Sequence, residues 1–404
     1  MNLASFADFK NIGYDEAMRR AHALVPYLRE QGDAIEAQRR MPAEVLEALH
    51  RSGLIRSHQP KAWGGMELDF VAYFDIPEVL GRGDASAAWN YANFASHHRN
   101  LAQWGMQAQE EVWGQNPDAL IASGIAFAQG RGRRVDGGIL LTGAWGFSSG
   151  VDVSQWNLLS CVLLDSDKPD ATPIDWRMNI VPSSDYTIDD DWRTLGLRGT
   201  GSCTVRCNEV FVPEHRSLSM HVARPGHSYP GLAVHTNPMY LVPTPALGGY
   251  CIAGALIGNA QAAVDLTLEL VKSRSTNYTT AKMRDFATVQ LRVGTAAAKI
   301  DGVRAWFRGN CLEGAKRYQQ GDVLSMAEKL RYKRDAAVGM KIVVEAVDSL
   351  FEMLGGNGIY DSGPLQRIFR DAHAGAAHFS FGVDAQATPW ALQALGGEVK
   401  SPTI

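Results

Sequence analysis

The feature that most constrains the fold of this chain is a double change in its hydrophobic pattern. Apolar residues recur at helical spacing up to about residue 117, fall into short alternating runs over residues 119–213, and return to helical spacing from residue 246 onward. Gly, Asp and Pro separate the alternating runs, as expected of a small antiparallel β-domain. We therefore expect a mainly α protein with a central β-domain.

The same pattern divides the chain into three parts. We expect an N-terminal helical domain over residues 1–117, a β-domain over 118–216, and a C-terminal part over 217–404. The first segment of that last part, 217–245, has no clear period. Long irregular loops in compact proteins are more often functional than idle, so we expect a lid over a substrate here. Long helices follow, with a turn at Gly321, and predict a four-helix bundle.

The composition argues against several classes of partner and site. The chain has 404 residues and a net charge of −4 without long runs of like charge, so neither a nucleic-acid nor an anionic-membrane partner is expected. The first ten residues lack the regions of a signal peptide, and no uninterrupted apolar run reaches the ~18 residues of a membrane-spanning helix. Five cysteines without CxxC spacing fit reduced thiols in a cytoplasmic protein, and they predict neither a disulfide framework nor a metal site.

Residues 355–379 are the best candidate for a ligand site. Gly355, Gly356 and Gly358 follow an apolar helical run, and Pro364 then opens a helix that we expect to extend as far as His378. Small residues surround His378, so that a bulky, flat ligand could approach it closely. Taken alone, the segment fits a packed core histidine better than a ligand-binding residue.

This segment reads GGNGIY followed by PLQRIFRDAHA, and it resembles the C-terminal signature of the acyl-CoA dehydrogenase superfamily. Dehydrogenases of that superfamily carry a catalytic glutamate at one of two places, which correspond here to Phe379 and Gly248. Both places lack a carboxylate, and His378 stands beside the first. The substitution resembles the flavin-dependent monooxygenase branch, which includes the oxygenase components of two-component aromatic hydroxylases.

Two stretches of the β-region extend the resemblance. Residues 141–156, LTGAWGFSSGVDVSQW, are similar to a motif of the monooxygenase branch, and residues 192–213 are similar to a strand of the whole superfamily. The resemblance implies that glycines let the strand approach the flavin ring, that Trp145 lies against the ring, and that Ser148 or Ser149 offers a hydroxyl to flavin N5. A hydroxyl suits that position because it both donates and accepts.

The resemblance also assigns the remaining site residues. His97, eight residues after Trp89, stands where the branch has a histidine near flavin and substrate, and the spacing selects it over His98. His378 is the expected base, because an imidazole accepts a proton near neutral pH. Cofactor phosphates are expected at Arg274 and at the turn formed by Gly355, Gly356 and Gly358, partly across the subunits of a homotetramer.

The implied reaction is the hydroxylation of an aromatic substrate, whether phenolic, indolic or polycyclic, by a C4a-hydroperoxyflavin made from reduced flavin (FADH2 or FMNH2) and O2. No nicotinamide-binding motif is found, so a separate NAD(P)H:flavin reductase is expected. Three alternatives stay open: an acyl-CoA dehydrogenase, a sulfur- or nitrogen-oxidising flavin monooxygenase of the same fold, and a non-catalytic flavin-fold protein.

Overall fold

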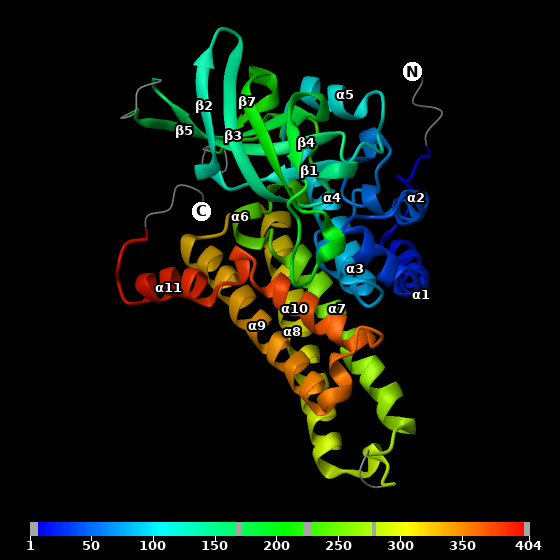
Figure 1. Cartoon of the computed structure of the whole chain (residues 1–404). Coiled ribbons are helices and arrows are strands. Elements are labelled where there is room, and N and C mark those ends of the chain that lie inside the picture. Colours follow the sequence, from blue (N-terminus) through cyan, green and yellow to red (C-terminus); the bar gives the residue numbers. More distant parts are fainter. Residues whose placement is uncertain (1–6, 167–170, 221–227, 277–279, 400–404) are drawn as a thin grey trace.

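The computed structural model of the chain describes residues 7–166, 171–220, 228–276 and 280–399. Figure 1 shows the β-domain at the top, the N-terminal helices beside and below it, and the C-terminal helices extending downward as a long bundle. The expected mainly α fold with a central sheet is confirmed. The interior is continuous between the parts, because one apolar core includes side chains from the N-terminal helices, the sheet and the bundle.

Among the described residues, five α-helices precede the sheet, and their ends follow local sequence signals. The Asp84 carboxylate accepts the backbone N–H of Ala87 at 2.9 Å and so begins the helix that carries Trp89. Gly53 takes a φ of 76° and ends the second helix, because glycine tolerates this left-handed conformation. The helices are α1 (Tyr14–Gln38), α2 (Ala43–Ser52), α3 (Ala72–Gly81), α4 (Ala85–Leu101) and α5 (Met106–Trp113).

The sheet has the order β6-β7-β3-β2-β4-β5-β8, with β1 also paired to β4. Both β1 and β2 run parallel to β4, whereas the other neighbouring pairs are antiparallel. The prediction of an antiparallel domain is therefore wrong in this respect, and the sheet is mixed. Its strands are β1 (Ile121–Gly124), β2 (Gly130–Val135), β3 (Gly138–Ser148), β4 (Trp156–Leu164), β5 (Pro173–Pro182), β6 (Thr187–Asp189), β7 (Cys203–Pro213) and β8 (Ser217–Ser219).

An irregularity at the end of β3 positions the residue that follows it. The pairing of β3 with β7 shifts register between Trp145 and Ser148, and Phe147 adopts a φ of 63°. A bulge of this kind bends a strand and redirects its side chains. Ser149 therefore leaves the sheet and faces α4, where it meets Trp89.

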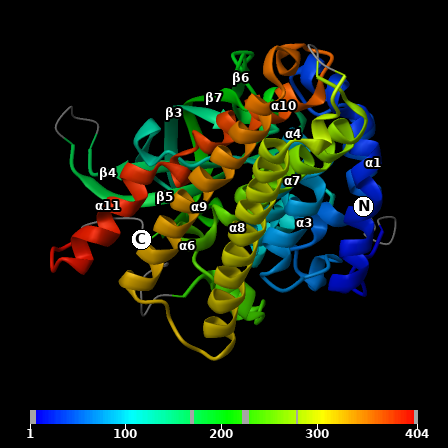
Figure 2. The same ribbon diagram turned by 90° about the horizontal axis from the view of Figure 1, so that it is seen from below.

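The C-terminal helices form the expected bundle, and Figure 2 shows α7, α8 and α9 side by side. The segment Thr244–Ser273 is long and apolar enough to cross a membrane, but 78% of its most apolar window is buried inside the protein, and a core helix of a bundle passes the same test. The helix is interrupted at Gly248 and Gly249, although one continuous helix was expected here. The helices are α6 (Thr244–Leu247), α7 (Tyr250–Ser273), α8 (Ala287–Gln319), α9 (Met326–Met353), α10 (Pro364–Ala376) and α11 (Val383–Ala394).

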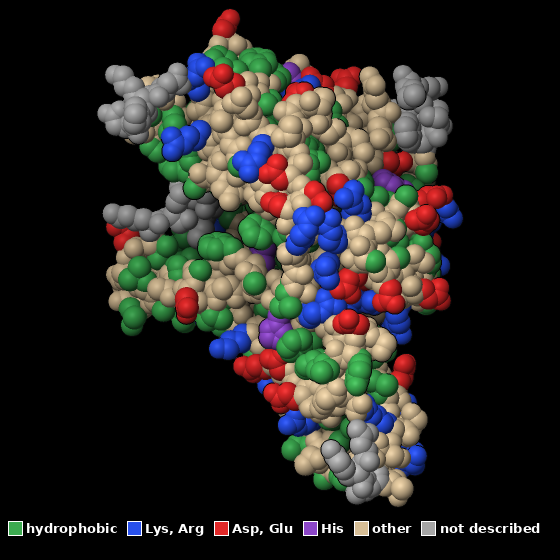
Figure 3. All heavy atoms as spheres, viewed as in Figure 1, with side chains coloured by type: hydrophobic (Ala, Val, Ile, Leu, Met, Phe, Trp, Pro, Cys, Tyr) green, Lys and Arg blue, Asp and Glu red, His purple; other side chains and the backbone are tan. Residues whose placement is uncertain are grey.

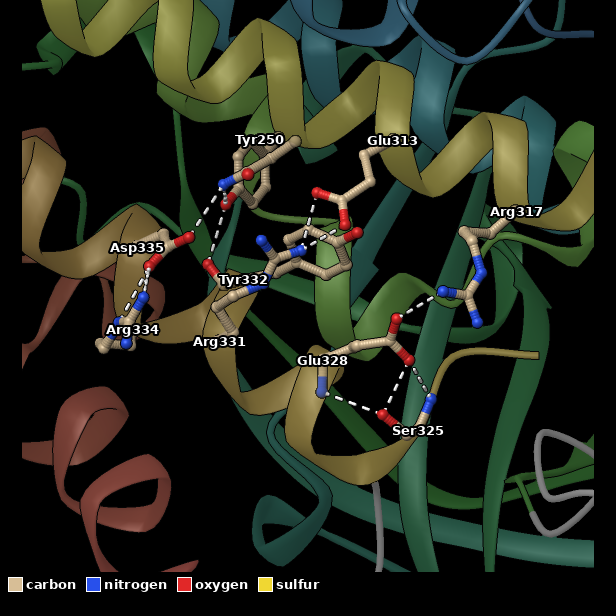
Figure 4. Close-up of polar contacts among 10 residues, drawn as sticks. Tyr250, Glu313, Arg317, Ser325, Glu328, Arg331, Tyr332, Arg334 and Asp335 are labelled. Carbon is tan, nitrogen blue, oxygen red and sulfur yellow. Dashed lines mark hydrogen bonds and ion pairs between the residues drawn. The ribbon is translucent and has the colours of Figure 1, made fainter. Parts of the chain in front are cut away.

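The turn between α8 and α9 is fixed by polar contacts that Figure 4 shows. Ser325 and Glu328 form a capping box at the start of α9, in which each side chain bonds to the backbone N–H of the other. Arg317 of α8 reaches Glu328 at 2.8 Å, and Arg331 of α9 pairs with Glu313 of α8 at 2.7 Å. The end of α8 is thus joined to the start of α9, and the predicted turn at residue 321 is confirmed.

Two segments in the C-terminal part differ from the expected helix or are only partly described. Helix α10 ends at Ala376, and His378 instead begins the short 3-10 helix η14 (Phe379–Phe381). The expectation that His378 lies on the helix is therefore wrong by two residues. In the expected lid, residues 230–233 and 238–241 form 3-10 turns, and residues 221–227 lie outside the described part of the chain.

Candidate active site

Three side chains from distant parts of the sequence meet where α4, the end of β3 and η14 come together. The Trp89 indole N–H donates to Ser149 Oγ at 3.2 Å. The imidazole of His378 packs edge-on against the Trp89 ring, with 5.7 Å between ring centroids. Trp89 and Ser149 are buried, and His378 is partly buried. The contact therefore joins one residue from each of the three parts of the chain.

Ser149 is the first member of a row of hydroxyl groups, which we call the hydroxyl chain. Ser149 Oγ lies 2.8 Å from Ser202 Oγ, and Ser202 Oγ lies 2.7 Å from Thr200 Oγ1. Thr200 Oγ1 then donates to the backbone carbonyl of Leu197 at 2.8 Å. All three hydroxyls are buried, so they form an ordered polar strip along one wall of the site.

The loop that carries this strip is attached to α10 by a buried carboxylate. Asp371 Oδ1 accepts the backbone N–H of Leu197 at 2.6 Å, and the Arg370 guanidinium donates to Leu195 O at 2.9 Å. Burial, followed by the negative charge of Asp84, raises the pKa of Asp371 from 3.8 to about 7. Asp371 was not expected in the site, although the Arg-Asp pair of the C-terminal motif marks its position.

The hydrogen bonds of His378 fix its tautomer. The backbone N–H of Ser380 donates to His378 Nδ1 at 3.2 Å, so the proton of the neutral ring lies on Nε2. Burial lowers the pKa of His378 to about 4, which keeps the ring neutral at pH 7. In this state Nε2 offers a hydrogen-bond donor, whereas a base needs a free lone pair. The role of general base predicted for His378 therefore does not fit the tautomer.

His97 has the opposite tautomer. Its Nδ1 lies 2.6 Å from the carbonyl oxygen of Ile121 and must carry the proton, which leaves the Nε2 lone pair free. Burial lowers its pKa to about 4, so it is also neutral at pH 7. His98 is occupied by Trp113, whose indole N–H donates to His98 Nδ1 at 3.0 Å while the two rings stack. The contrast agrees with the choice of His97 over its neighbour.

His97 and the Trp89–His378 contact are separate features of α4. Eight residues of helix rise correspond to about 12 Å between Trp89 and His97. A ligand that reaches both would present different atoms to each histidine. The two imidazoles therefore provide a donor and an acceptor at separate positions.

Trp145 does not lie at the surface of the site. Its side chain is 0% exposed, and its indole N–H donates to Ser160 O at 2.8 Å within the core of the sheet. A Cβ at Gly124, Gly130 or Gly143 would come within 2.5–2.7 Å of this side chain. These glycines, of which Gly143 belongs to the motif, therefore accommodate the tryptophan's own indole, and the expected contact between Trp145 and a flavin ring is wrong.

Ser148 also faces the sheet, where its hydroxyl accepts a hydrogen bond from Asn157 Nδ2 at 3.0 Å. Its side chain is fully buried. Of the two adjacent serines, only Ser149 contacts Trp89 and the hydroxyl chain. The bulge at Phe147 explains why successive serines serve different surroundings.

The residues expected to bind phosphate lie on two different elements. Arg274 is the C-cap residue that directly follows α7. Gly355, Gly356 and Gly358 belong to the 3-10 turn η13 (Gly355–Ile359), which follows α9 and packs against α9 and α10. Gly355 has a φ of 55°, and no atom lies within 4 Å of a Cβ built at Gly355 or Gly356. The glycine backbone is thus open to a ligand, and its role in phosphate binding stays a prediction.

The surroundings of Ser149 fit a flat, largely apolar ring with a polar edge. Three large apolar side chains that lie within two residues of Ser149, Leu197 or His378 in the sequence are exposed: Phe147 is 75% exposed, Leu195 62% and Phe379 71%. Figure 3 shows a hollow between the β-domain and the C-terminal helices, with hydrophobic side chains and a histidine in it. A flavin combines such a ring with hydrogen-bonding atoms on its edge. Within the described residues, no group of three His, Cys, Asp or Glu side chains could hold a metal ion.

Comparisons with known proteins agree with this geometry. Residues 21–116 match the N-terminal domain and residues 250–382 the C-terminal domain of the acyl-CoA dehydrogenase family models. The oxygenase subunit HsaA of a flavin-dependent monooxygenase from Rhodococcus jostii (strain RHA1) is 34% identical over 362 residues, which cover 89% of this chain and 93% of that one. The oxygenase component of an FADH2-dependent resorcinol hydroxylase from Rhizobium sp. (strain MTP-10005) is 31% identical over 390 residues and 94% of each chain.

A solved structure gives the same relationship. The crystal structure of 3-HSA hydroxylase from Rhodococcus sp. RHA1 superposes with a TM-score of 0.91 at 33% identity, and it covers 96% of this chain and 99% of that one. Similarity of this extent includes all three parts of the fold. The chain therefore belongs to the acyl-CoA dehydrogenase superfamily, in its flavin-dependent monooxygenase branch.

Proposed function

We propose that this chain is the oxygenase component of a two-component flavin-dependent monooxygenase, which uses reduced flavin and O2 to hydroxylate a phenolic substrate. The observation that carries the proposal is the ordered hydroxyl of Ser149, held by Trp89 and Ser202 beside His378. Similarity to a resorcinol hydroxylase, which is named for a phenol and for FADH2, supports the substrate class and the cofactor.

His97 is the better candidate for the base that receives the phenol proton. Its Nδ1–H is fixed on Ile121 O, so the Nε2 lone pair is left to accept a proton. Burial lowers the pKa of His97 to about 4 when no ligand is bound, which is low for a base at neutral pH. A phenolate next to the ring raises that pKa, because opposite charges favour the ionised form. Proton transfer is then coupled to substrate binding.

His378 supplies a donor in this proposal. Its Nε2–H can bond to a substrate or flavin oxygen without changing charge, because burial lowers its pKa and keeps the ring neutral. The edge-on contact with Trp89 holds the imidazole plane. His378 thus orients a ligand, and the proton acceptor lies at His97.

The flavin supplies the oxygen activation, and the protein supplies positioning and the exclusion of water. The hydroxyl chain and its donor are ordered before any ligand enters, because Trp89, Ser149 and Ser202 are buried. Ser149 would meet the N5 edge of the ring. Arg274 and the Gly355–Gly358 turn are the proposed phosphate-binding elements.

The partners follow from the same proposal. A separate NAD(P)H:flavin reductase provides the reduced flavin, in keeping with the description of the relatives as oxygenase components or subunits. We further propose a homotetramer in the cytoplasm, on the basis of the resemblance and the cysteine pattern. The 3-10 turns near residues 230–241 are the proposed substrate lid.

The decisive experiment supplies reduced FAD without oxygen and then adds ¹⁸O2 together with a panel of phenols. A phenol that gains one ¹⁸O atom per flavin oxidised supports the proposal. A second reaction with acyl-CoA esters and an electron acceptor tests the dehydrogenase alternative, for which Gly248 and Phe379 replace the expected glutamates. Oxidation of an acyl-CoA without transfer of oxygen to any phenol would contradict the proposed function.

A further inference from the structure

The direction of the hydrogen bonds in the hydroxyl chain is determined by its two ends. At one end the Trp89 indole N–H can only donate, and it reaches Ser149 Oγ at 3.2 Å. At the other end the Leu197 carbonyl oxygen can only accept, and it lies 2.8 Å from Thr200 Oγ1. The three hydroxyls between these ends have one hydrogen each to share.

Each hydrogen can be assigned in turn. Thr200 donates its hydrogen to Leu197 O, so Ser202 must donate across the 2.7 Å contact with Thr200. Ser149 must then donate to Ser202 across 2.8 Å, because two oxygens approach this closely only with a hydrogen between them. The single hydrogen of Ser149 is therefore committed to Ser202, and its oxygen offers only lone pairs to Trp89 and to the site.

The backbone at the far end of the hydroxyl chain is held in place by further hydrogen bonds. The Thr200 carbonyl accepts from Gly150 N at 2.8 Å and from Asn90 Nδ2 at 3.3 Å, which fixes the loop against α4 and the end of β3. The Leu197 carbonyl also accepts the Trp192 indole N–H at 3.0 Å. If the hydroxyls turned around, the Thr200 oxygen would face this carbonyl without a hydrogen between them.

We infer that the hydroxyl chain makes Ser149 an obligate hydrogen-bond acceptor and thereby selects the reduced form of the flavin, with Ser202 and Thr200 as positioning residues. The inference rests on the proposed function. Reduced flavin carries an N–H at N5, whereas oxidised flavin has a bare nitrogen lone pair there. An oxygen that can only accept pairs with the first form and repels the second. The site thus distinguishes the two redox states before oxygen arrives.

The test compares dissociation constants for oxidised and reduced FAD, measured by anaerobic titration of the flavin absorbance, in the full-length protein. Ser202→Ala removes the acceptor of the Ser149 hydrogen, which becomes free to donate to N5 of oxidised flavin. We expect the ratio of the oxidised to the reduced dissociation constant to fall by about tenfold or more, mainly through tighter binding of oxidised FAD. Each tenfold fall lowers the two-electron potential of the bound flavin by about 30 mV.

Two further variants make the result specific. Thr200→Val removes the far end of the hydroxyl chain, allows Ser202 to turn toward Ser149, and should lower the same ratio if Ser202→Ala fails to fold. Ser154→Ala is the matched control, because its buried hydroxyl bonds to Gly150 O at 2.8 Å and lies outside the chain. It should leave the ratio at the wild-type value.

The outcomes separate the inference from the proposed function. The inference is supported if the wild type prefers reduced FAD, if Ser202→Ala and Thr200→Val lose this preference, and if Ser154→Ala keeps it. Equal weakening of both redox forms in the chain variants would overturn it and leave the proposed function intact, because a packing defect does not discriminate between N5 states. A wild type that binds no reduced flavin would overturn both.

Discussion

Replacing Asp371 by asparagine tests the most unusual electrostatic feature of the site. The pKa of this carboxyl is about 7 in the folded protein, against an ordinary value of 3.8, because it is buried and lies near Asp84. Between these values the folded state keeps a proton that the unfolded state has lost. The stability contributed by this proton is fully present below pH 4 and is lost as the pH rises through 7. The amide of Asp371→Asn does not titrate, and its oxygen can still accept the Leu197 N–H.

The size of the effect follows from linkage. Between pH 5 and pH 8 the wild type loses about 2.6 kcal/mol of stability relative to the variant, because the slope of about 1.4 kcal/mol per pH unit falls off as Asp371 ionises around pH 7. An unfolding entropy of about 2.1 cal/mol/K per residue over 404 residues converts this to roughly 3 °C. The melting temperature of Asp371→Asn should therefore rise relative to that of the wild type, and the difference between them should increase by about 3 °C from pH 5 to pH 8.

The assay is differential scanning calorimetry of both proteins in buffers of equal ionic strength. Asp33→Asn is the control, since it removes an exposed carboxylate that pairs with Arg367 of the same helix as Asp371. A difference in melting temperature that stays constant with pH, or narrows as the pH rises, would refute the account of Asp371 as a carboxyl kept neutral by burial.

Three further changes test the assignments of the site. Ser149→Ala should keep the fold but release more hydrogen peroxide per product in a peroxidase-coupled assay, because it loses a hydrogen bond of about 1–3 kcal/mol; unchanged coupling would contradict its place at N5. His97→Ala should slow hydroxylation by roughly 10²–10⁴-fold with little change in reduced-flavin binding, and a comparable loss in His378→Ala alone would reverse the roles given to the two histidines. Trp145→Phe should lower the melting temperature, because it removes the hydrogen bond to Ser160 O. The dissociation constant for reduced FAD should stay unchanged. Weaker flavin binding without loss of stability would show that Trp145 belongs to the site.

Local signals predicted much of the fold. The turn at Gly321 appears as expected, and the cap at Asp84 and the helix end at Gly53 likewise depend on residues close in sequence. The parallel pairing of β1 and β2 with β4 could not be predicted in this way. Alternation of apolar residues along a strand is the same whichever direction its neighbour runs.

The site was predicted in part, and its errors have a common cause. Residue type and motif spacing identified Ser149, His97 and His378, but their roles depend on partners elsewhere. The tautomer of His97 is determined by Ile121, and the inward position of Trp145 by glycines on two other strands. No pattern within α10 marks its end before His378, because Ala376 and Ala377 would both continue a helix.

The attachment of the site loop to α10 has a consequence for the synthesis of the protein. The bond from Leu197 to Asp371 joins residues 174 positions apart, and the bond from Arg370 to Leu195 spans 175. A growing chain folds from its N-terminus, so the β-domain leaves the ribosome long before its loop has a helix to bind. We expect the hydroxyl chain to become fully ordered only after residues 364–376 have emerged. A nascent or truncated chain is therefore expected to bind reduced flavin weakly. Reduced flavin is then not oxidised unproductively in an incomplete site.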